Sequence, residues 1–312
     1  MRRRAFLLGL SACAVRSVWP ESHWDRLIAY NREQGGVSLL VQQNGKTLCE
    51  DYTAGEDRAY ELASGTKSFW GTLALVLKLD LDESMGTVLQ EWSGDARSQI
   101  TIRQLLTLTS GIPGGAIGQP PTFAQALEAT QRFPAGTRFQ YGPTPYQAFG
   151  AYLRRKYRMD PLDLLQRYIL GPAQLRYQDW KRGSDGQIHL PSGAKLNARN
   201  WALYGAWVLK NQKALAPCFQ GTGANLAYGL TWWLKKPSDE RVRSNVGPAM
   251  RNILELGSER SLPEDIWVAA GAGNQRLYLV PSQSMVIVRQ DDRLVNPDTR
   301  FSDRDFMVKA LG

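Results

Sequence analysis

The segment from Ser64 to Leu79 constrains the fold of this chain more than any other. A helix over this segment carries large apolar side chains on nearly all of its sides, namely Phe69, Trp70, Leu73, Leu75, Val76, Leu77 and Leu79. A surface helix has one apolar stripe, whereas a helix that is apolar all round lies inside the protein. The sequence therefore predicts a central, buried helix that begins near Ser64.

Ser64 and Lys67 form an S-x-x-K pattern at the start of this helix. Residues three apart share a helix face, so the lysine amine can reach the serine hydroxyl. The partial positive charge of a helix N-terminus and burial both disfavour the ammonium form, which lowers the lysine pKa. A neutral amine can then accept the serine proton. Taken alone, the pattern also fits a helix-capping serine and a lysine in solvent.

A second S-x-x-K pattern lies at Ser192 and Lys195. Here the serine belongs to a Pro-Ser-Gly turn signal, and the next helix is predicted only from about residue 197. We therefore expect Lys195 to lie in a loop, where it would not share a helix face with Ser192.

Histidine is scarce, because the chain has only His23, near the N-terminus, and His189, in a predicted strand. A Ser-His-Asp hydrolase or an H-E-x-x-H zinc site needs better placed histidines. The chain also lacks the G-x-S-x-G nucleophile elbow. If this is a serine enzyme, its base is therefore a lysine or a tyrosine.

Beyond Cys13, the chain has only Cys49 and Cys218. They permit at most one disulfide, and no pair of cysteines has the spacing of metal ligands. The sequence favours two buried free thiols, and it predicts neither a metal nor an organic cofactor.

Residues 1–20 predict an export signal. Three arginines at 2–4 precede an apolar run at 6–10 that is too short to span a membrane. The start resembles a twin-arginine signal, and the Leu-Ser-Ala-Cys stretch ending at Cys13 resembles a lipobox; simple cleavage after Ala14 is the alternative. We expect an exported, periplasmic protein whose only membrane contact would be a lipid on Cys13.

The charge balance is basic, with 38 Lys and Arg against 29 Asp and Glu. Without the three N-terminal arginines the balance is 35 to 29, which suits anionic envelope polymers or simple solubility. The basic residues are dispersed and none of their runs is interleaved with aromatics, so we predict no nucleic-acid binding. An apolar fraction of 43% and ten tryptophans exclude a disordered chain.

Strand-like segments lie at both ends of the chain, and helical segments lie between them. Strands are predicted at 36–42 and 46–52, joined by an Asn-Gly hairpin signal, and at 266–270, 276–280 and 285–290. Helices are predicted near 101–108, 123–132, 145–157, 161–170, 197–209 and 303–311.

This order predicts an α/β fold of the α+β type, in which one antiparallel sheet built from both chain ends is flanked by helices. Within a domain of residues 21–312, we expect a sheet lobe at about 21–80 and 226–312. An inserted, mainly helical lobe would take about 81–225. A cleft between two lobes is where a site is expected.

Six stretches occur in a set order along the chain: 61–69 (ELASGTKSF), 79–82 (LDLD), 102–111 (IRQLLTLTSG), 134–143 (PAGTRFQYGP), 228–233 (YGLTWW) and 271–281. Together they resemble the motifs of the serine beta-lactamase and penicillin-binding protein superfamily. The resemblance is to the class C beta-lactamase-like group of serine hydrolases, which includes esterases and D-amino-acid peptidases, and it spans about residues 36–292. It implies a beta-lactamase-like fold and a serine hydrolase.

The resemblance also implies roles for individual residues. Ser64 would be the acylated nucleophile and Lys67 its proton acceptor. Tyr141 matches the tyrosine of the Y-x-N motif. Because a phenol near an ammonium is favoured as its anion, Tyr141 would act as a base or proton relay. The alternative is an ordinary core tyrosine. The backbone N–H groups of Ser64 and Ala272 would hold the oxyanion.

Two positions depart from the pattern of the superfamily. Pro143 stands where the Y-x-N motif has its asparagine, and Ala269-Ala270-Gly271 stands where lactamases carry K-T-G. The missing lysine and threonine normally engage a substrate carboxylate, so an uncharged ester or amide fits better.

The leading hypothesis is an exported serine hydrolase acting on a small-molecule ester or amide, with the cell envelope as one source. One alternative is a beta-lactamase or D-alanyl-D-alanine peptidase-like penicillin-binding enzyme. The other is a catalytically weak binding protein on the same fold.

Two adjacent tryptophans add an aromatic signal near the end of the chain. In a strand, Trp232 and Trp233 would point to opposite faces, so at most one of them would line a cleft. A purely structural role for both fits the sequence as well.

Overall fold

The structure is a computed structural model that describes residues 22–294 and 301–312. Its main sheet has the strand order β2-β1-β9-β8-β7-β6, and neighbouring strands are antiparallel. The strands are β1 (Ser38–Gln43), β2 (Lys46–Tyr52), β6 (Trp233–Leu234), β7 (Trp267–Gly271), β8 (Gln275–Val280) and β9 (Met285–Gln290). Because β1 pairs with β9 along its whole length, the predicted sheet built from both chain ends is confirmed.

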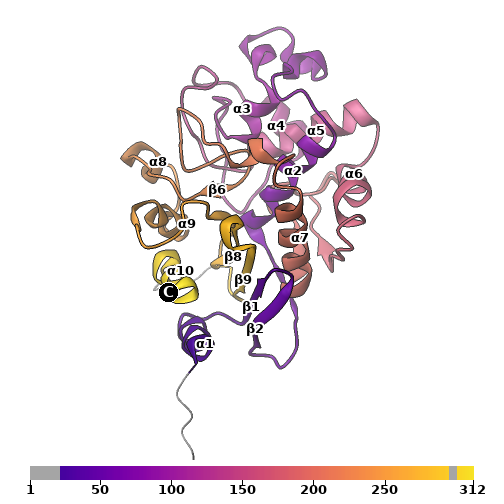
Figure 1. Cartoon of the computed structure of the whole chain (residues 1–312). Coiled ribbons are helices and arrows are strands. Elements are labelled where there is room, and N and C mark those ends of the chain that lie inside the picture. Colours follow the sequence, from indigo (N-terminus) through magenta and orange to yellow (C-terminus); the bar gives the residue numbers. More distant parts are fainter. Residues whose placement is uncertain (1–21, 295–300) are drawn as a thin grey trace, which may run out of the picture.

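The helices occupy the ends and the middle of the chain (Figure 1). They are α1 (His23–Glu33), α2 (Ser68–Val76), α3 (Ile102–Leu106), α4 (Phe123–Glu128), α5 (Thr144–Tyr157), α6 (Pro161–Leu165), α7 (Ala198–Lys210), α8 (Glu240–Ser244), α9 (Pro248–Leu254) and α10 (Asp303–Leu311). A 3-10 helix, η1 (Ala63–Lys67), leads directly into α2. The predicted export signal, including Cys13, lies outside the described residues.

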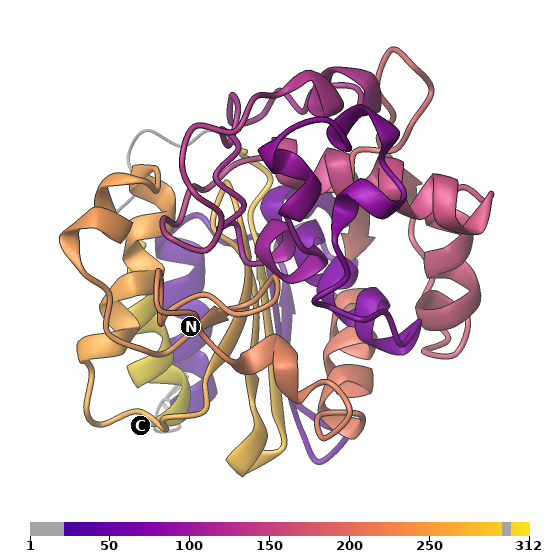
Figure 2. The same cartoon turned by 90° about the horizontal axis from the view of Figure 1, so that it is seen from above.

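The main sheet separates two layers of helices, with α1, α9 and α10 on one side and α7 on the other (Figure 2). Close packing of α7 requires Gly205, because a Cβ there would lie 2.8 to 3.0 Å from Val286, Leu279 and Leu277. α7 falls within the range predicted for the helical lobe, yet it packs on β1, β8 and β9. α7 thus belongs by its contacts to the layers around the main sheet.

A second, small sheet has the order β3-β5-β4 and consists of β3 (Ala59–Glu61), β5 (Ala194–Asn197) and β4 (Asp179–Trp180). The prediction that Lys195 lies in a loop is wrong, because Lys195 pairs with Glu61 on one side and Asp179 on the other. The predicted strand at His189 is also wrong, since only its neighbour Ile188 forms an isolated bridge.

Local capping explains where several helices begin and end. Thr101 and Gln104 form the predicted reciprocal capping box of α3. The helix predicted over 123–132 ends earlier, at Glu128. Beyond it the N–H groups of Arg132 and Phe133 donate to the Gly111 carbonyl instead of continuing the helix.

α2 is buried on all sides over residues 68–74, which confirms the predicted central helix. The Trp70 indole N–H donates to the Leu190 carbonyl, which ties α2 to the segment before β5. On another side Gly71 permits close approach, because a Cβ there would lie 2.3 Å from the Leu230 carbonyl oxygen. α2 is therefore held from two sides. This packing fixes the position of η1, the segment at its N-terminal end.

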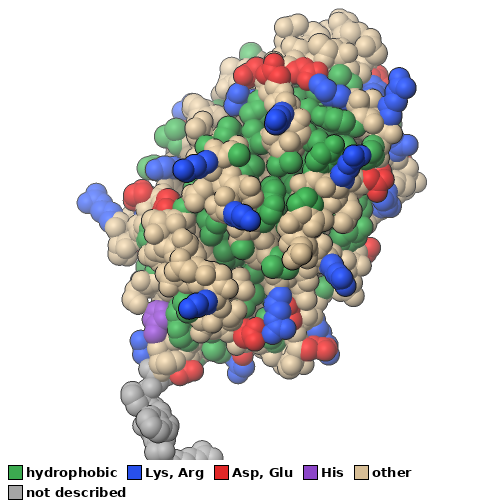
Figure 3. Space-filling view, turned by 45° about the vertical axis from the view of Figure 1, so that its right-hand side comes forward, with side chains coloured by type: hydrophobic (Ala, Val, Ile, Leu, Met, Phe, Trp, Pro, Cys, Tyr) green, Lys and Arg blue, Asp and Glu red, His purple; other side chains and the backbone are tan. Residues whose placement is uncertain are grey.

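The surface over α6 and α7 shows Lys and Arg side chains dispersed among apolar and polar ones rather than gathered in one patch (Figure 3). Within residues 22–294 and 301–312, no helix has the length and apolarity needed to cross a bilayer. The same residues hold no cluster of three or more His, Cys, Asp or Glu side chains suited to a metal ion.

Candidate active site

The chain bends sharply just before Ser64. Ala63 has a φ of 45°, in the left-handed region that costs a non-glycine residue energy. The Gly65 N–H then donates to the Leu62 carbonyl, which closes the first turn of η1. This bend places the half-buried Ser64 at the start of a buried helix, with its hydroxyl directed at the side chain one turn later.

Lys67 lies with its Nζ 2.8 Å from Ser64 Oγ. The side chain is nearly inaccessible, with 4% of its surface exposed, and Nζ also donates to the Pro191 carbonyl at 3.2 Å. Burial lowers the pKa of Lys67 to about 7, because a desolvated ammonium is unfavourable and no carboxylate offsets the loss. Around neutral pH the amine is therefore in part neutral and able to accept the serine proton.

Aromatic rings form the walls around this lysine. Nζ lies 4.9 Å from the ring centroid of Tyr141 and 5.4 Å from that of Tyr146. Behind them, Trp233 packs against Tyr141 at 5.6 Å and Tyr228 bonds to the Tyr146 hydroxyl at 2.8 Å. The rings exclude water from the amine, which is the physical origin of its low pKa.

Tyr141 is buried, and its hydroxyl has no hydrogen-bond partner within the described residues. Burial raises the pKa of Tyr141 to about 12, although the nearby Ser64 hydroxyl and the Arg276 charge act in the opposite direction. This shift is opposite in direction to the one that the sequence predicted for Tyr141. Desolvation outweighs these two effects and disfavours the phenolate, which suits Tyr141 to donating a proton rather than accepting one.

Pro143, which replaces the asparagine of the Y-x-N motif, caps the start of α5. Its carbonyl accepts hydrogen bonds from the N–H groups of Tyr146 and Gln147. The neighbouring Thr144 N–H donates to the Gly114 carbonyl. Pro143 thus fixes the helix that presents Tyr146, and it offers a substrate neither a side-chain amide nor a backbone N–H.

Ala272 follows directly after β7, in the turn that leads to β8. Gly271 packs against the backbone around the serine, because a Cβ there would lie 2.0 Å from the Leu62 carbonyl oxygen and 3.1 Å from the Gly65 nitrogen. Only glycine permits this approach. The N–H groups of Ser64 and Ala272 have no acceptor among the described residues. The structure therefore brings together all four residues that sequence analysis selected.

The histidines and cysteines that sequence analysis named have other surroundings. His23 Nε2 contacts the Ala310 carbonyl oxygen at 3.3 Å, and the only hydrogen bonds of His189 in the described structure are those of its backbone. Cys49 and Cys218 are both buried and free. Of the two tryptophans, Trp232 packs on Tyr204, whereas Trp233 packs on Tyr141.

Sequence reasoning missed the Pro191 carbonyl and the rings of Tyr146 and Tyr228. A backbone carbonyl leaves no side-chain signature, so no pattern could have shown it. Tyr146 lies on the predicted helix 145–157, but nothing in its spacing distinguishes it from an ordinary core residue. Only the path of the chain between the lobes brings these groups to Lys67.

Comparison with known proteins gives the family. The family model described as Beta-lactamase matches residues 24–311, almost the whole chain. This chain belongs to the beta-lactamase family.

Individual relatives of this beta-lactamase family member are distant. Protein flp of Staphylococcus aureus (strain MW2) is 23% identical over 202 residues, which cover 55% of this chain and 41% of that protein. The chain thus spans less than half the length of that relative.

Solved structures share the fold over nearly the full length. The class C beta-lactamase from Rhodobacter sphaeroides matches with a TM-score of 0.64 and 17% identity, covering 92% of this chain and 97% of that chain. EstCE1, a hydrolase with promiscuous acyltransferase activity, matches with a TM-score of 0.67 and 13% identity, covering 92% and 97%. These likenesses support the beta-lactamase-like fold.

Proposed function

We propose that this chain is an exported serine hydrolase that cleaves an ester or an amide through an acyl-enzyme on Ser64. The observation that carries the proposal is the 2.8 Å separation of Ser64 Oγ from the Nζ of a buried lysine whose pKa is about 7. A nucleophile beside a base that is partly neutral at working pH is the arrangement that acyl transfer requires.

In the acylation step, Ser64 Oγ forms a bond to the substrate carbonyl carbon while its proton passes to Lys67 Nζ. The carbonyl oxygen becomes an oxyanion, which accepts hydrogen bonds from the N–H groups of Ser64 and Ala272. The bond to the leaving group then breaks. The leaving oxygen or nitrogen takes the Tyr141 proton, and Tyr141 recovers one from the Lys67 ammonium.

In the deacylation step, water attacks the acyl carbon and gives its proton to the same lysine–tyrosine pair. The bond from the acyl carbon to Ser64 Oγ then breaks, and the serine recovers its proton. The acid product leaves, and the site returns to its starting state with no redox partner or cofactor consumed.

An uncharged substrate is favoured because the positions that match K-T-G carry no cationic side chain. The positions that match K-T-G are Ala269, Ala270 and Gly271, and both alanines are buried. The Tyr141 ring lies beside Lys67 and packs against Trp233. An ester or amide with an apolar acyl group therefore suits the site better than a carboxylate-bearing beta-lactam.

Export belongs to the proposal because of the basic and apolar pattern in residues 1–20. A lipid on Cys13 would appear as an added mass in protein recovered from membranes. An unprocessed N-terminus, seen in intact-mass analysis of protein made in a bacterial host with an export system, would contradict this part.

The deciding experiment is fluorophosphonate labelling of the purified protein beside Ser64→Ala and Lys67→Ala, with p-nitrophenyl ester and nitrocefin turnover in parallel. Labelling and ester turnover that vanish in both variants would support the proposal. Nitrocefin turnover faster than ester turnover would instead favour the lactamase or D-alanyl-D-alanine peptidase alternative. A wild type that is not labelled would overturn the proposal in favour of a binding protein.

A further inference from the structure

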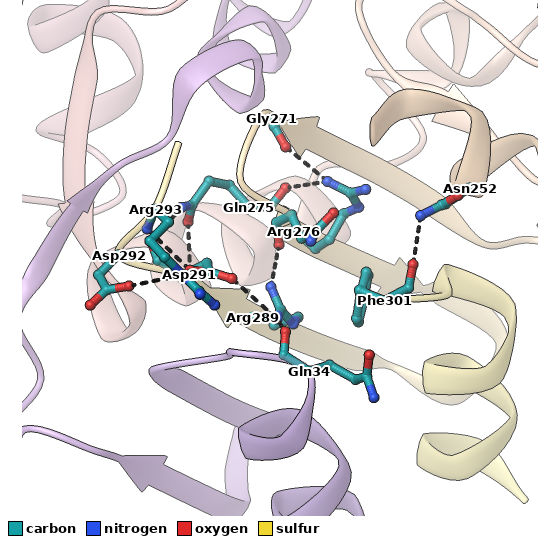
Figure 4. Close-up of polar contacts among 11 residues, drawn as sticks. Gln34, Asn252, Gly271, Gln275, Arg276, Arg289, Asp291, Asp292, Arg293 and Phe301 are labelled. Carbon is teal, nitrogen blue, oxygen red and sulfur yellow. Dashed lines mark hydrogen bonds and ion pairs between the residues drawn. The ribbon is translucent and has the colours of Figure 1, made fainter. Parts of the chain in front are cut away.

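Two buried arginines hold the turn that carries Ala272 (Figure 4). Arg276 Nη1 donates to the Gly271 carbonyl at 2.9 Å and to the Gln275 carbonyl at 3.1 Å. Arg289 Nη1 donates to the Asn274 carbonyl at 2.9 Å. The carbonyl groups on either side of the turn are thus fixed by charged donors, which form stronger hydrogen bonds than neutral ones.

The two arginines lie opposite one another on β8 and β9 and face the layer of α1 and α10. Both side chains are fully buried. Arg276 is held by a two-pronged ion pair, with Nε and Nη2 at 2.7 and 3.0 Å from the carboxylate oxygens of Asp303, the first residue of α10. A buried cation is costly unless it is paired in this way.

The hydrogen bond from Arg276 to the Gly271 carbonyl differs from the bonds to Gln275 and Asn274, because only the Gly271 carbonyl shares a peptide group with the Ala272 N–H. The Gly271 carbonyl and the Ala272 N–H belong to one planar, trans peptide group, so they point in opposite directions. The hydrogen bond that Arg276 donates to this oxygen therefore also fixes the direction of the Ala272 N–H, on the opposite side of the peptide from Arg276. A charged donor on the oxygen also polarises the peptide and strengthens the N–H as a donor.

We propose that Arg276 is a positioning residue for the oxyanion site, acting through the Gly271–Ala272 peptide, and that Asp303 holds Arg276 in place. The proposal rests on the acyl-transfer function above. Through Asp303, α10 would then contribute to the reaction, although it lies far from Ser64 along the chain.

Arg289 provides a matched control. It is equally buried and also bonds to the turn, but through Asn274, whose carbonyl lies three peptides beyond the one that carries the Ala272 N–H. Replacing either arginine by lysine removes a planar, forked donor from the same buried layer and should lower the melting temperature to a similar degree. Only the change at Arg276 should weaken the stabilisation of an oxyanion.

The test compares wild type, Arg276→Lys and Arg289→Lys in the full chain. We measure the melting temperature, kcat and KM for p-nitrophenyl acetate, and the affinity for phenylboronic acid. This boronic acid forms a tetrahedral adduct with a nucleophilic serine. We expect Arg276→Lys to lower kcat by about 10- to 100-fold with KM changed less than about threefold, since loss of one oxyanion donor costs about 10²- to 10³-fold. Boronate affinity should fall with kcat. In Arg289→Lys, kcat and the boronate affinity should both stay within about threefold of the wild-type values.

Equal kcat losses in the two variants, or an unchanged boronate affinity in Arg276→Lys, would overturn the inference while leaving the proposed function intact. A wild type that neither hydrolyses the ester nor binds the boronate would overturn both. If Arg276→Lys does not fold, Asp303→Asn takes its place. A drop in kcat and boronate affinity of about 3- to 10-fold at constant KM is then expected, because a neutral amide holds the guanidinium less firmly.

Discussion

The chain contains the same four-residue pattern twice, and the two copies have different structures. Ser64 and Lys67 lie on a continuous helical turn, with Oγ and Nζ 2.8 Å apart. Ser192 lies in the turn before β5 and Lys195 lies within β5, and their side chains share no hydrogen bond in the described structure. Identical spacing thus yields a nucleophile with its base only where the backbone is helical.

Burial separates the two copies further. Lys67 is enclosed by aromatic rings, whereas Lys195 is half-exposed at the edge of a polar hollow with Asp57 and Glu56. The second copy also serves the first, because Pro191, the residue before Ser192, provides the carbonyl that holds Lys67. A serine–lysine pair becomes reactive through desolvation, which depends on the fold around it and not on the pattern.

Ser64→Ala should give the largest effect, because it removes the atom that forms the acyl bond. We expect ester turnover to fall by about 10⁴-fold or more, as when other serine hydrolases lose their nucleophile. Fluorophosphonate labelling followed by mass spectrometry checks this directly. Ser192→Ala is the matched control and should keep its label; loss of label there would break the distinction between the two copies.

Lys67→Met should lower turnover by about 10³-fold, within the range for loss of a general base. Since a buried ammonium is unfavourable, the same change should leave the melting temperature unchanged or raise it by a few degrees, about the effect of 1 kcal/mol. Activity and calorimetry on one sample test both parts. A large fall in melting temperature would show that Lys67 supports the fold rather than the reaction.

Tyr141→Phe should have an effect that depends on the leaving group. A neutral phenol serves as a proton donor, so we expect a loss of about 100-fold with an alkyl ester and only a few-fold with a p-nitrophenyl ester, whose leaving group needs no proton. Steady-state kinetics with the two substrates measures the difference. Equal losses would favour the anionic base that the sequence predicted.

The rate should depend on pH through Lys67. Its amine must be neutral to accept the serine proton, and its pKa is about 7. As the pH falls below 7 the ammonium forms, so kcat/KM should fall by about tenfold per pH unit and should level off above that pH. A pH profile with no inflection between about 6 and 8 would contradict a base with this pKa.

Lys195→Ala should give the smallest effect, within about twofold in turnover, as for most surface changes. Its side chain is half-exposed and makes no ion pair in the described residues. Measured beside Lys67→Met, it provides the contrast between the two copies of the pattern. A loss approaching that of Lys67→Met would mean that β5 contributes to the reaction itself.

The parts of the site that could be predicted are those with local signatures. The apolar surroundings of Trp70 and the spacing of Ser64 and Lys67 follow from helix periodicity. The sheet followed from alternation at both chain ends. Tyr141 and Ala272 required the order of several motifs, because neither has a signature of its own.

The remaining parts depend on contacts between distant segments. Arg276 and Arg289 on β8 and β9 would suggest a solvent-facing side of the sheet. Instead that side is covered by α10, and Asp303 makes the burial of Arg276 tolerable. Burial disfavours the anionic form that the sequence predicted for Tyr141, because the sequence shows which groups are near but not how far water is excluded.

The pairing of β1 with β9 has a consequence for how the enzyme comes into being. Nearly the whole chain must be made before the sheet can close, and such non-local closure is slow compared with helix formation. A nascent chain that has reached α7 already holds Ser64 and Lys67, but the strand end next to Ala272 and the final helix do not yet exist. The proposed hydrolysis would therefore require the last strands to dock, so that activity would report a finished molecule.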